Sequence, residues 1–206
     1  VNISFLIITS IVNTLGVVAS AGVGISEKLF VFLSIVPMSF MSALSAFVAQ
    51  NMGAGQKKRA EEALFAAQKV SICFGVAMFL LTCFGGGGLA SLFTDDPAVI
   101  TATAQYLRGG SVENILNALI FCLLGYFNGR EHTTFVMTQG IFAAFLVRIP
   151  LSYFLSQLPN TGMFLISLAI PATAVVSLVL CAGYLVLLRR KDRMSKPEDV
   201  LNGADF

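Results

Sequence analysis

Glu113 is a single carboxylate deep inside a long apolar stretch of the chain. It follows Val99 by about 14 residues, which places it roughly 20 Å along a helix that rises 1.5 Å per residue. A charge at that depth in a membrane is costly unless it is paired or hydrated, so such residues usually face a cavity and serve function. Asn117 lies one turn later on the same helical face, and Asn114 is adjacent.

Carboxylate and amide oxygens together are suitable ligands for Na⁺, and a desolvated carboxylate can instead carry a proton. Glu113 and Asn117 are therefore our candidates for coupling to Na⁺ or H⁺, and no other metal or cofactor is expected. The alternative is a purely structural ion pair between Glu113 and Arg108, five residues earlier.

Other polar groups also fall within apolar stretches. Arg108 and Arg148 either extend towards the outer headgroups or pair with Glu113 as part of a gate. Asn13 and Gln139 either bond to neighbouring helices or line a cavity for substrate, and Phe5 is added as an aromatic candidate for that cavity.

The composition excludes most classes of protein that could carry these residues. Hydrophobic residues make up 56% of the 206 positions and charged residues only 12%, whereas soluble domains carry about 25% charged residues. The charges are also bunched, which leaves uncharged stretches such as 29–56 and 149–188. A soluble enzyme, a disulfide-stapled secreted protein and a nucleic-acid binder are excluded. The chain is predicted to be all-α, a polytopic membrane protein in a lipid bilayer.

Six membrane spans are expected, separated by turn signals such as Gly22-Val23-Gly24, Gly53-Ala54-Gly55 and Asn128-Gly129. Asp95 and Asp96, followed by Pro97, predict the start of the fourth helix. The predicted spans are residues 2–22, 29–50, 61–84, 99–128, 133–157 and 163–188.

Basic residues predict the orientation of these spans. Nine lie on one predicted side, against only Lys28 outside the spans on the other, and such residues favour the cytoplasm. The C-terminus, including a polar tail over 193–206, is therefore expected to be cytoplasmic. The nine basic residues are Lys57, Lys58, Arg59, Arg130, Arg189, Arg190, Lys191, Arg193 and Lys196.

Four separated motifs resemble the multidrug and toxic compound extrusion (MATE) transporters. The longest is Ser45-Ala46-Phe47-Val48-Ala49-Gln50-Asn51-Met52-Gly53-Ala54-Gly55, followed by Lys57-Lys58-Arg59-Ala60. The others are Ile11-Val12-Asn13-Thr14-Leu15-Gly16, Gly125-Tyr126-Phe127-Asn128-Gly129 and Val147-Arg148-Ile149-Pro150-Leu151-Ser152. The resemblance covers residues 1–192.

This resemblance implies one lobe of a two-lobed carrier with twelve helices. The chain would be the C-terminal lobe, helices seven to twelve, so we expect an N-terminal lobe of the same polypeptide to precede Val1. Members of the family export amphipathic, often cationic compounds in exchange for Na⁺ or H⁺. Sodium-coupled members use an acidic residue near the position of Glu113, but the second acidic residue of that site falls where Val1 and Asn2 stand here.

The resemblance implies a transporter in the plasma (inner) membrane, of bacterial origin, with small amphipathic molecules as substrates. No Ser-His-Asp set, HExxH motif or paired carboxylates occur, so we do not expect an enzyme. One alternative is a flippase for lipid-linked or polysaccharide substrates, which would need several inward-facing basic residues. The other is an inactive half-transporter fragment.

Overall fold

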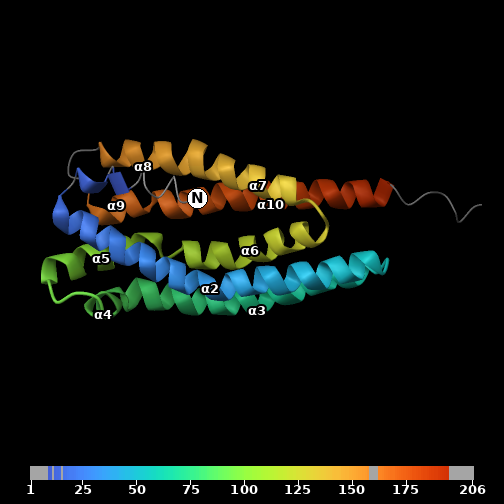
Figure 1. Ribbon diagram of the computed structural model, residues 1–206, viewed down its shortest axis with the longest axis horizontal. Helices are drawn as coiled ribbons and strands as arrows, with labels where there is room; N and C mark the ends of the chain where they lie inside the picture. The colour runs from blue at the N-terminus through green and yellow to red at the C-terminus, as the bar shows by residue number, and fades with distance from the viewer. Residues whose placement is uncertain (1–8, 11, 15, 158–161, 195–206) are drawn as a thin grey trace, which may run out of the picture.

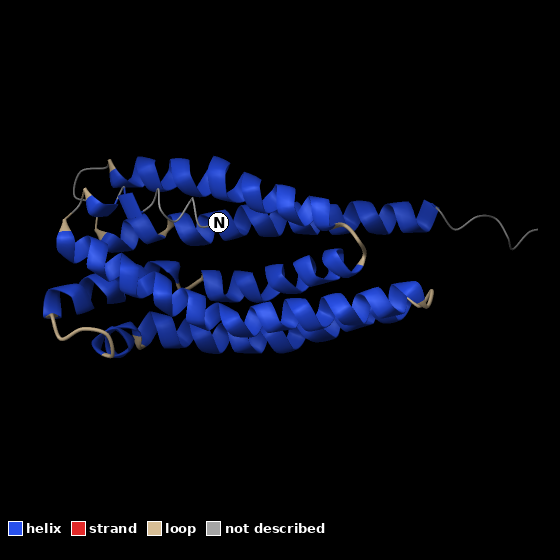
Figure 2. Ribbon diagram, viewed as in Figure 1, coloured by secondary structure: helices blue, strands red, loops and turns tan. Residues whose placement is uncertain are grey.

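The computed structural model describes residues 9–10, 12–14, 16–157 and 162–194, and in these ranges all regular structure is helical. Figure 2 shows the helices running along one common axis. The described helices are α2 Val17–Gly53, α3 Lys57–Phe84, α4 Gly86–Ser91, α5 Pro97–Gly110, α6 Glu113–Gly129, α7 Thr133–Phe142, a π-helix η1 Ala143–Arg148, α8 Ile149–Ser156, α9 Met163–Ser167 and α10 Ala169–Met194.

The all-α membrane fold predicted from composition is confirmed. Among the described residues, four helical segments are long and apolar enough to cross a membrane: Val17–Gly53, Lys57–Phe84, Thr133–Ser156 and Met163–Asp192. The bent pair α5 and α6 supplies a fifth candidate span. Of the first predicted span, residues 2–22, positions 2–8, 11 and 15 lie outside the described residues, and positions 17–22 form the start of α2.

The predicted loop at Gly22-Val23-Gly24 is wrong, because α2 continues through it without a break. Gly22 serves packing rather than turning: a Cβ placed on it would come 3.0 Å from the Cβ of Ala102 on α5. The chain turns earlier, at Gly16, where φ is 106°. Glu27 and Lys28, which we expected in an outer loop, therefore lie within a helix of 37 residues.

The fourth predicted span, residues 99–128, is bent by 50° between α5 and α6. The start of α5 is as predicted, since Asp96 Oδ1 accepts a hydrogen bond from the Ala98 N–H at 2.9 Å and Pro97 follows. The bend comes at Ser111-Val112, directly after Gly109 and Gly110. Glycine lowers the helical preference there and lets neighbouring groups approach closely, so one continuous helix is not formed.

The last two predicted spans are interrupted in a similar way. The segment 133–157 passes through the π-helix η1 shortly before Pro150, which has no N–H to donate to the preceding turn. The segment 163–188 is divided at Leu168 into α9 and α10. Sequence periodicity located these apolar segments and missed their internal breaks.

Helices α2 and α6 lie side by side along much of their length (Figure 1). Gly125 and Gly129, four residues apart, lie on the α6 face that touches α2. A Cβ on Gly125 would come 2.6 Å from the Met41 carbonyl oxygen, and one on Gly129 would come 2.5 Å from that of Ser45. Small residues at this spacing let membrane helices approach closely and gain dispersion energy.

Ion pairs join three segments at the end of the bundle on the right of Figure 1. Asp192 of α10 accepts from Arg130 at 2.8 Å and pairs with Lys57 at 3.3 Å. Arg189 pairs with Glu61 at 3.6 Å. The α2–α3 turn, the α6–α7 loop and the end of α10, which carry most of the basic residues, thus meet at one end of the bundle.

Replacement of Gly125 by alanine is expected to destabilise the fold by about 1–3 kcal/mol, because the new methyl group forces α2 and α6 apart. Thermal unfolding of the purified protein in detergent checks this. Gly183→Ala is the matched control, because a Cβ there meets nothing within 4 Å. An equal loss of stability in both variants would contradict close packing at Gly125.

Glu131 is the one described non-glycine residue with a positive φ, 65°, and it lies one residue beyond the C-cap of α6. The His132 N–H donates to the Phe127 carbonyl at 2.9 Å across this turn. We expect Glu131→Gly to raise stability by roughly 0.5–1 kcal/mol, because glycine adopts this conformation without steric cost. The same unfolding measurement applies, and Glu131→Ala, which removes the charge but keeps Cβ, should give no gain.

Candidate functional site

A cavity of about 200 Å³ lies between α2, α3 and α6. Its charged residues are two carboxylates, Glu27 and Glu113, and one guanidinium, that of Arg148. Much of the remaining wall is apolar or aromatic. The lining residues are Glu27, Phe30, Val31, Leu33, Ser34, Pro37, Phe74, Gly75, Met78, Glu113, Asn114, Asn117, Phe121 and Arg148.

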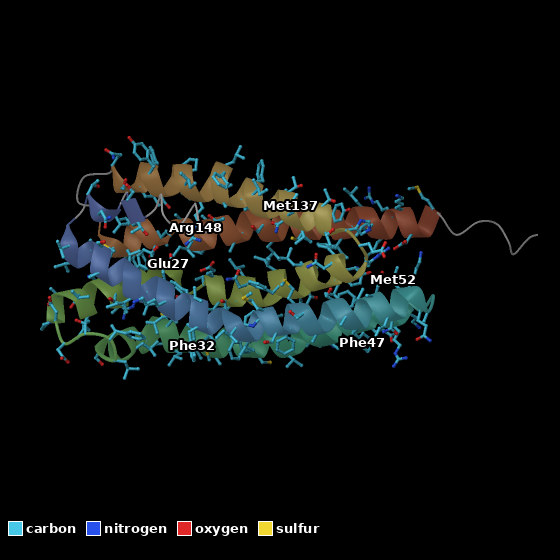
Figure 3. All side chains as sticks on the ribbon, in the orientation of Figure 1. Glu27, Phe32, Phe47, Met52, Met137 and Arg148 are labelled. Atoms are coloured by element: carbon cyan, nitrogen blue, oxygen red, sulfur yellow. The ribbon has the colours of Figure 1, made fainter. Side chains whose placement is uncertain are left out.

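Glu27 and Arg148 form an ion pair across the bundle (Figure 3). Arg148 Nη2 donates to Glu27 Oε1 at 3.0 Å, and only 19% and 14% of the two side chains are exposed. The Tyr106 hydroxyl donates to the same oxygen at 3.4 Å from a position that is 1% exposed. Two donors therefore hold one Glu27 oxygen in place.

Glu113 owes its position to the break between α5 and α6. It occupies the first turn of α6 rather than the middle of a long helix. The N-terminal end of a helix carries a partial positive charge, which stabilises a carboxylate. Half-helix ends of this kind inside a membrane are a common means of building ion and substrate sites in transporters.

The two asparagines near Glu113 face different neighbours. Asn114 Nδ2 donates to Thr82 Oγ1 of α3 at 3.2 Å, so it ties α6 to α3. Asn117 interacts with the Glu113 carboxylate from one turn further along α6. The structure thus brings Glu113 and Asn117 together.

A second cavity, of about 160 Å³, lies between α6 and α10. Glu113, Asn117, Phe121 and Arg148 line both cavities, so they form a shared wall. The far side of the second cavity includes the hydroxyl-bearing residues Thr173 and Ser177.

The π-helix η1 ends at Arg148. A π-helix adds a residue to the helical turn and so changes the direction in which the following side chains point. Arg148 reaches the cavity from this irregular segment, whereas Leu146, two residues before it, is 62% exposed.

Arg108 lies elsewhere. Its side chain is exposed, and Nε donates to the carbonyl oxygen of Cys83 at 3.3 Å. Within the described part of the chain no salt bridge joins Arg108 to Glu113, so the structural pair that we held open as an alternative is not formed. Of the two arginines predicted for a gate, the structure brings only Arg148 to the cavity.

The predicted cavity residues Asn13 and Gln139 do not line either cavity around Glu113. Asn13 accepts a hydrogen bond from the Ser20 hydroxyl and lines a shallow depression with Gly16 and Val17. Gln139 is buried on α7, and its Nε2 donates to the Val136 carbonyl at 3.4 Å. Phe5 lies outside the described residues. Their roles in substrate binding stay predictions.

Sequence reasoning missed Glu27 and Tyr106. Glu27 was assigned to a loop because of the glycines before it, although the apolar pattern continues on both sides of Glu27-Lys28. A membrane helix tolerates one acidic residue where a basic partner faces it, and Arg148 is such a partner. Nothing in the sequence around Tyr106 distinguishes it from other aromatic residues.

The chain resembles known membrane proteins in sequence and in fold. The MatE family model matches residues 1–154. A Shewanella oneidensis protein described as a FAD transporter is 38% identical over 89 residues, covering 43% of this chain and 20% of that protein.

Two solved structures share the fold, with 91% of this chain covered in each case. One is a MOP superfamily transporter from Pyrococcus furiosus, whose description reports a binding pocket of reverse polarity suggesting a different function; its TM-score is 0.83 at 17% identity. The other is a multidrug resistance MATE family transporter in an inward-facing conformation, with a TM-score of 0.77 at 16% identity.

The chain spans 41% and 44% of these two structures, and so less than half the length of either. The family model matches about three quarters of the chain. The sequence motifs and the helical membrane fold of this chain agree with that match. Members of this family are transporters, not enzymes. This chain belongs to the MatE family of membrane transporters.

Proposed function

We propose that this chain serves secondary active export of amphipathic cations in exchange for Na⁺ or H⁺. The observation that carries the proposal is the cavity that brings together two carboxylates and one guanidinium, of which only Glu27 and Arg148 are paired. With Glu27 paired to Arg148, the negative charge of Glu113 has no salt-bridge partner among the described residues. Inside a membrane such a charge favours binding of a cation.

Exchange follows from competition for this charge. A proton can bind to the Glu113 carboxylate, or Na⁺ can bind to it together with the side-chain oxygen of Asn117. Either ion neutralises the cavity and lowers its affinity for an organic cation. An organic cation bound beside Glu113 also neutralises the cavity, and it lowers the affinity of the cavity for the proton or Na⁺. Each ligand therefore favours release of the other, which is the requirement for antiport by alternating access.

The apolar walls are suited to the organic part of such a substrate. Phe30, Phe74 and Phe121 provide aromatic rings near the carboxylates, and Met78 provides a flexible thioether. Aromatic faces attract cations, and methionine adapts to differently shaped ligands. These contacts support broad recognition of amphipathic cations.

We also propose that the chain is the C-terminal lobe of a two-lobed carrier in the plasma (inner) membrane of a bacterium. Its coverage of less than half of the two solved transporters supports this. The basic end of the bundle, with Lys57, Arg130 and Arg189, would face the cytoplasm together with the C-terminus. The partner lobe would complete the substrate cavity.

Export of FAD is the second candidate, because a relative carries that description. FAD bears two phosphate groups, which are normally bound by several arginine or lysine side chains. Arg148 is the one basic residue lining the two described cavities around Glu113, and it is already paired with Glu27. The charge of these cavities therefore favours the cation, and the same reasoning applies to a flippase for phosphate-bearing lipids.

Ethidium accumulation in pump-deficient bacteria that express the full-length protein tests the proposal. Cells with the unmodified protein should accumulate less dye than cells with an empty vector. Glu113→Gln should remove most of this difference, because the glutamine can neither carry the coupling ion nor attract the substrate. Protein levels in the membrane are measured in parallel.

Glu62→Gln is the matched control, because Glu62 is exposed and its salt-bridge partner among the described residues is Lys58 of the same helix, at 3.9 Å. It should export ethidium normally. Normal export by Glu113→Gln would contradict the coupling role of Glu113. Secretion of FAD without any export of ethidium would show that the anion is the substrate.

A further inference from the structure

We infer that Arg148 limits the cavity to substrates with a single positive charge. The inference rests on the proposed function and specifies its substrate class: monocations are accepted and dications of the same shape are rejected. The positive charge of Arg148 is paired with the Glu27 carboxylate, one of the two carboxylates that line the cavity. Glu113 is left for the substrate.

The charges that line the cavity support this assignment. With both carboxylates ionised, Glu27 and Glu113 contribute two negative charges and Arg148 one positive charge, which leaves one negative charge in total. One bound monocation makes the cavity neutral. A dication would leave one positive charge uncompensated in a low-dielectric environment, where unbalanced charge is strongly unfavourable.

The guanidinium is held firmly enough to act in this way. Its Nη2 donates to Glu27 Oε1 at 3.0 Å, and that oxygen is also bound by the Tyr106 hydroxyl. Only 19% of the Arg148 side chain is exposed and its Nε is buried, so the guanidinium lies at the cavity rather than among the headgroups. Arg148 is therefore a fixed part of the cavity wall.

Removal of the Arg148 guanidinium should change the charge of the preferred substrate from +1 to +2. In Arg148→Met, the long apolar side chain fills similar space, and Glu27 and Glu113 both become available to a ligand. In the double variant Glu27→Gln with Arg148→Met, the total returns to one negative charge. In Glu27→Gln alone the total is zero, and cations of either kind should bind poorly.

The experiment measures equilibrium binding of two probes to the purified full-length protein, which includes the proposed partner lobe, in detergent at alkaline pH, where both carboxylates are ionised. The probes are the monocation N-methyl-bipyridinium and the dication dimethyl-bipyridinium, which differ in shape by one methyl group. The unmodified protein should prefer the monocation. Arg148→Met should reverse this preference, with a change of about tenfold or more in the ratio of the two affinities. The reason is that the second positive charge of the dication can then pair with the freed Glu27 carboxylate.

Lys28→Met is the matched control. Lys28 is next to Glu27 on α2 but is exposed and lines neither cavity around Glu113, so its loss should leave the preference unchanged. Arg148→Lys keeps the charge and should keep the preference for the monocation. The double variant should also recover it, which separates an effect of charge from a general disturbance of the fold.

The outcomes distinguish the inference from the proposed function. If the unmodified protein binds neither probe, the proposed export of cations fails, and the inference fails with it. If the unmodified protein binds both probes equally, or if Arg148→Met still rejects the dication while binding the monocation, only the inference is overturned. Reversal in Arg148→Met with recovery in the double variant supports it.

Discussion

Charged groups inside an apolar bundle must compensate one another, and this requirement explains the arrangement of the centre of this protein. Glu27, Glu113 and Arg148 come from three separate helical segments and meet at one cavity. Outside a membrane each could be solvated alone, whereas inside one an isolated charge is expensive. The 3.0 Å pair between Arg148 and Glu27 satisfies two of the three and leaves Glu113 to interact with ligands.

The irregular parts of the fold serve this arrangement. The break between α5 and α6 places Glu113 at a helix N-terminus, and the π-helix η1 directs Arg148 towards α2. Regular packing supplies the rigid frame around them: Gly125 and Gly129 hold α6 closely against α2, the helix that carries Glu27.

Sequence reasoning located the apolar segments and the start of α5, because apolar length and the Asp-Pro signal are local properties. It also identified Glu113 and Asn117 as neighbours, since both lie on one helical face. It placed Glu27 in a loop because the glycines before it were interpreted as a turn. Their real role, close contact with α5, depends on a partner distant in the sequence. The pairing of Arg148 with Glu27 could not be predicted for the same reason, because 121 positions of sequence separate the two residues.

The position of Glu113 in the wall between two cavities has a consequence for the paths that ligands take. A carboxylate that lines two compartments can be contacted from both, so an inorganic ion and an organic molecule can compete for its charge from different sides. The compartment beside Thr173 and Ser177 offers hydroxyl oxygens, which suit an inorganic ion, whereas the other offers the rings of Phe30 and Phe74, which suit an organic cation. Selection by the chemistry of the lining would then take place before either species meets the charge.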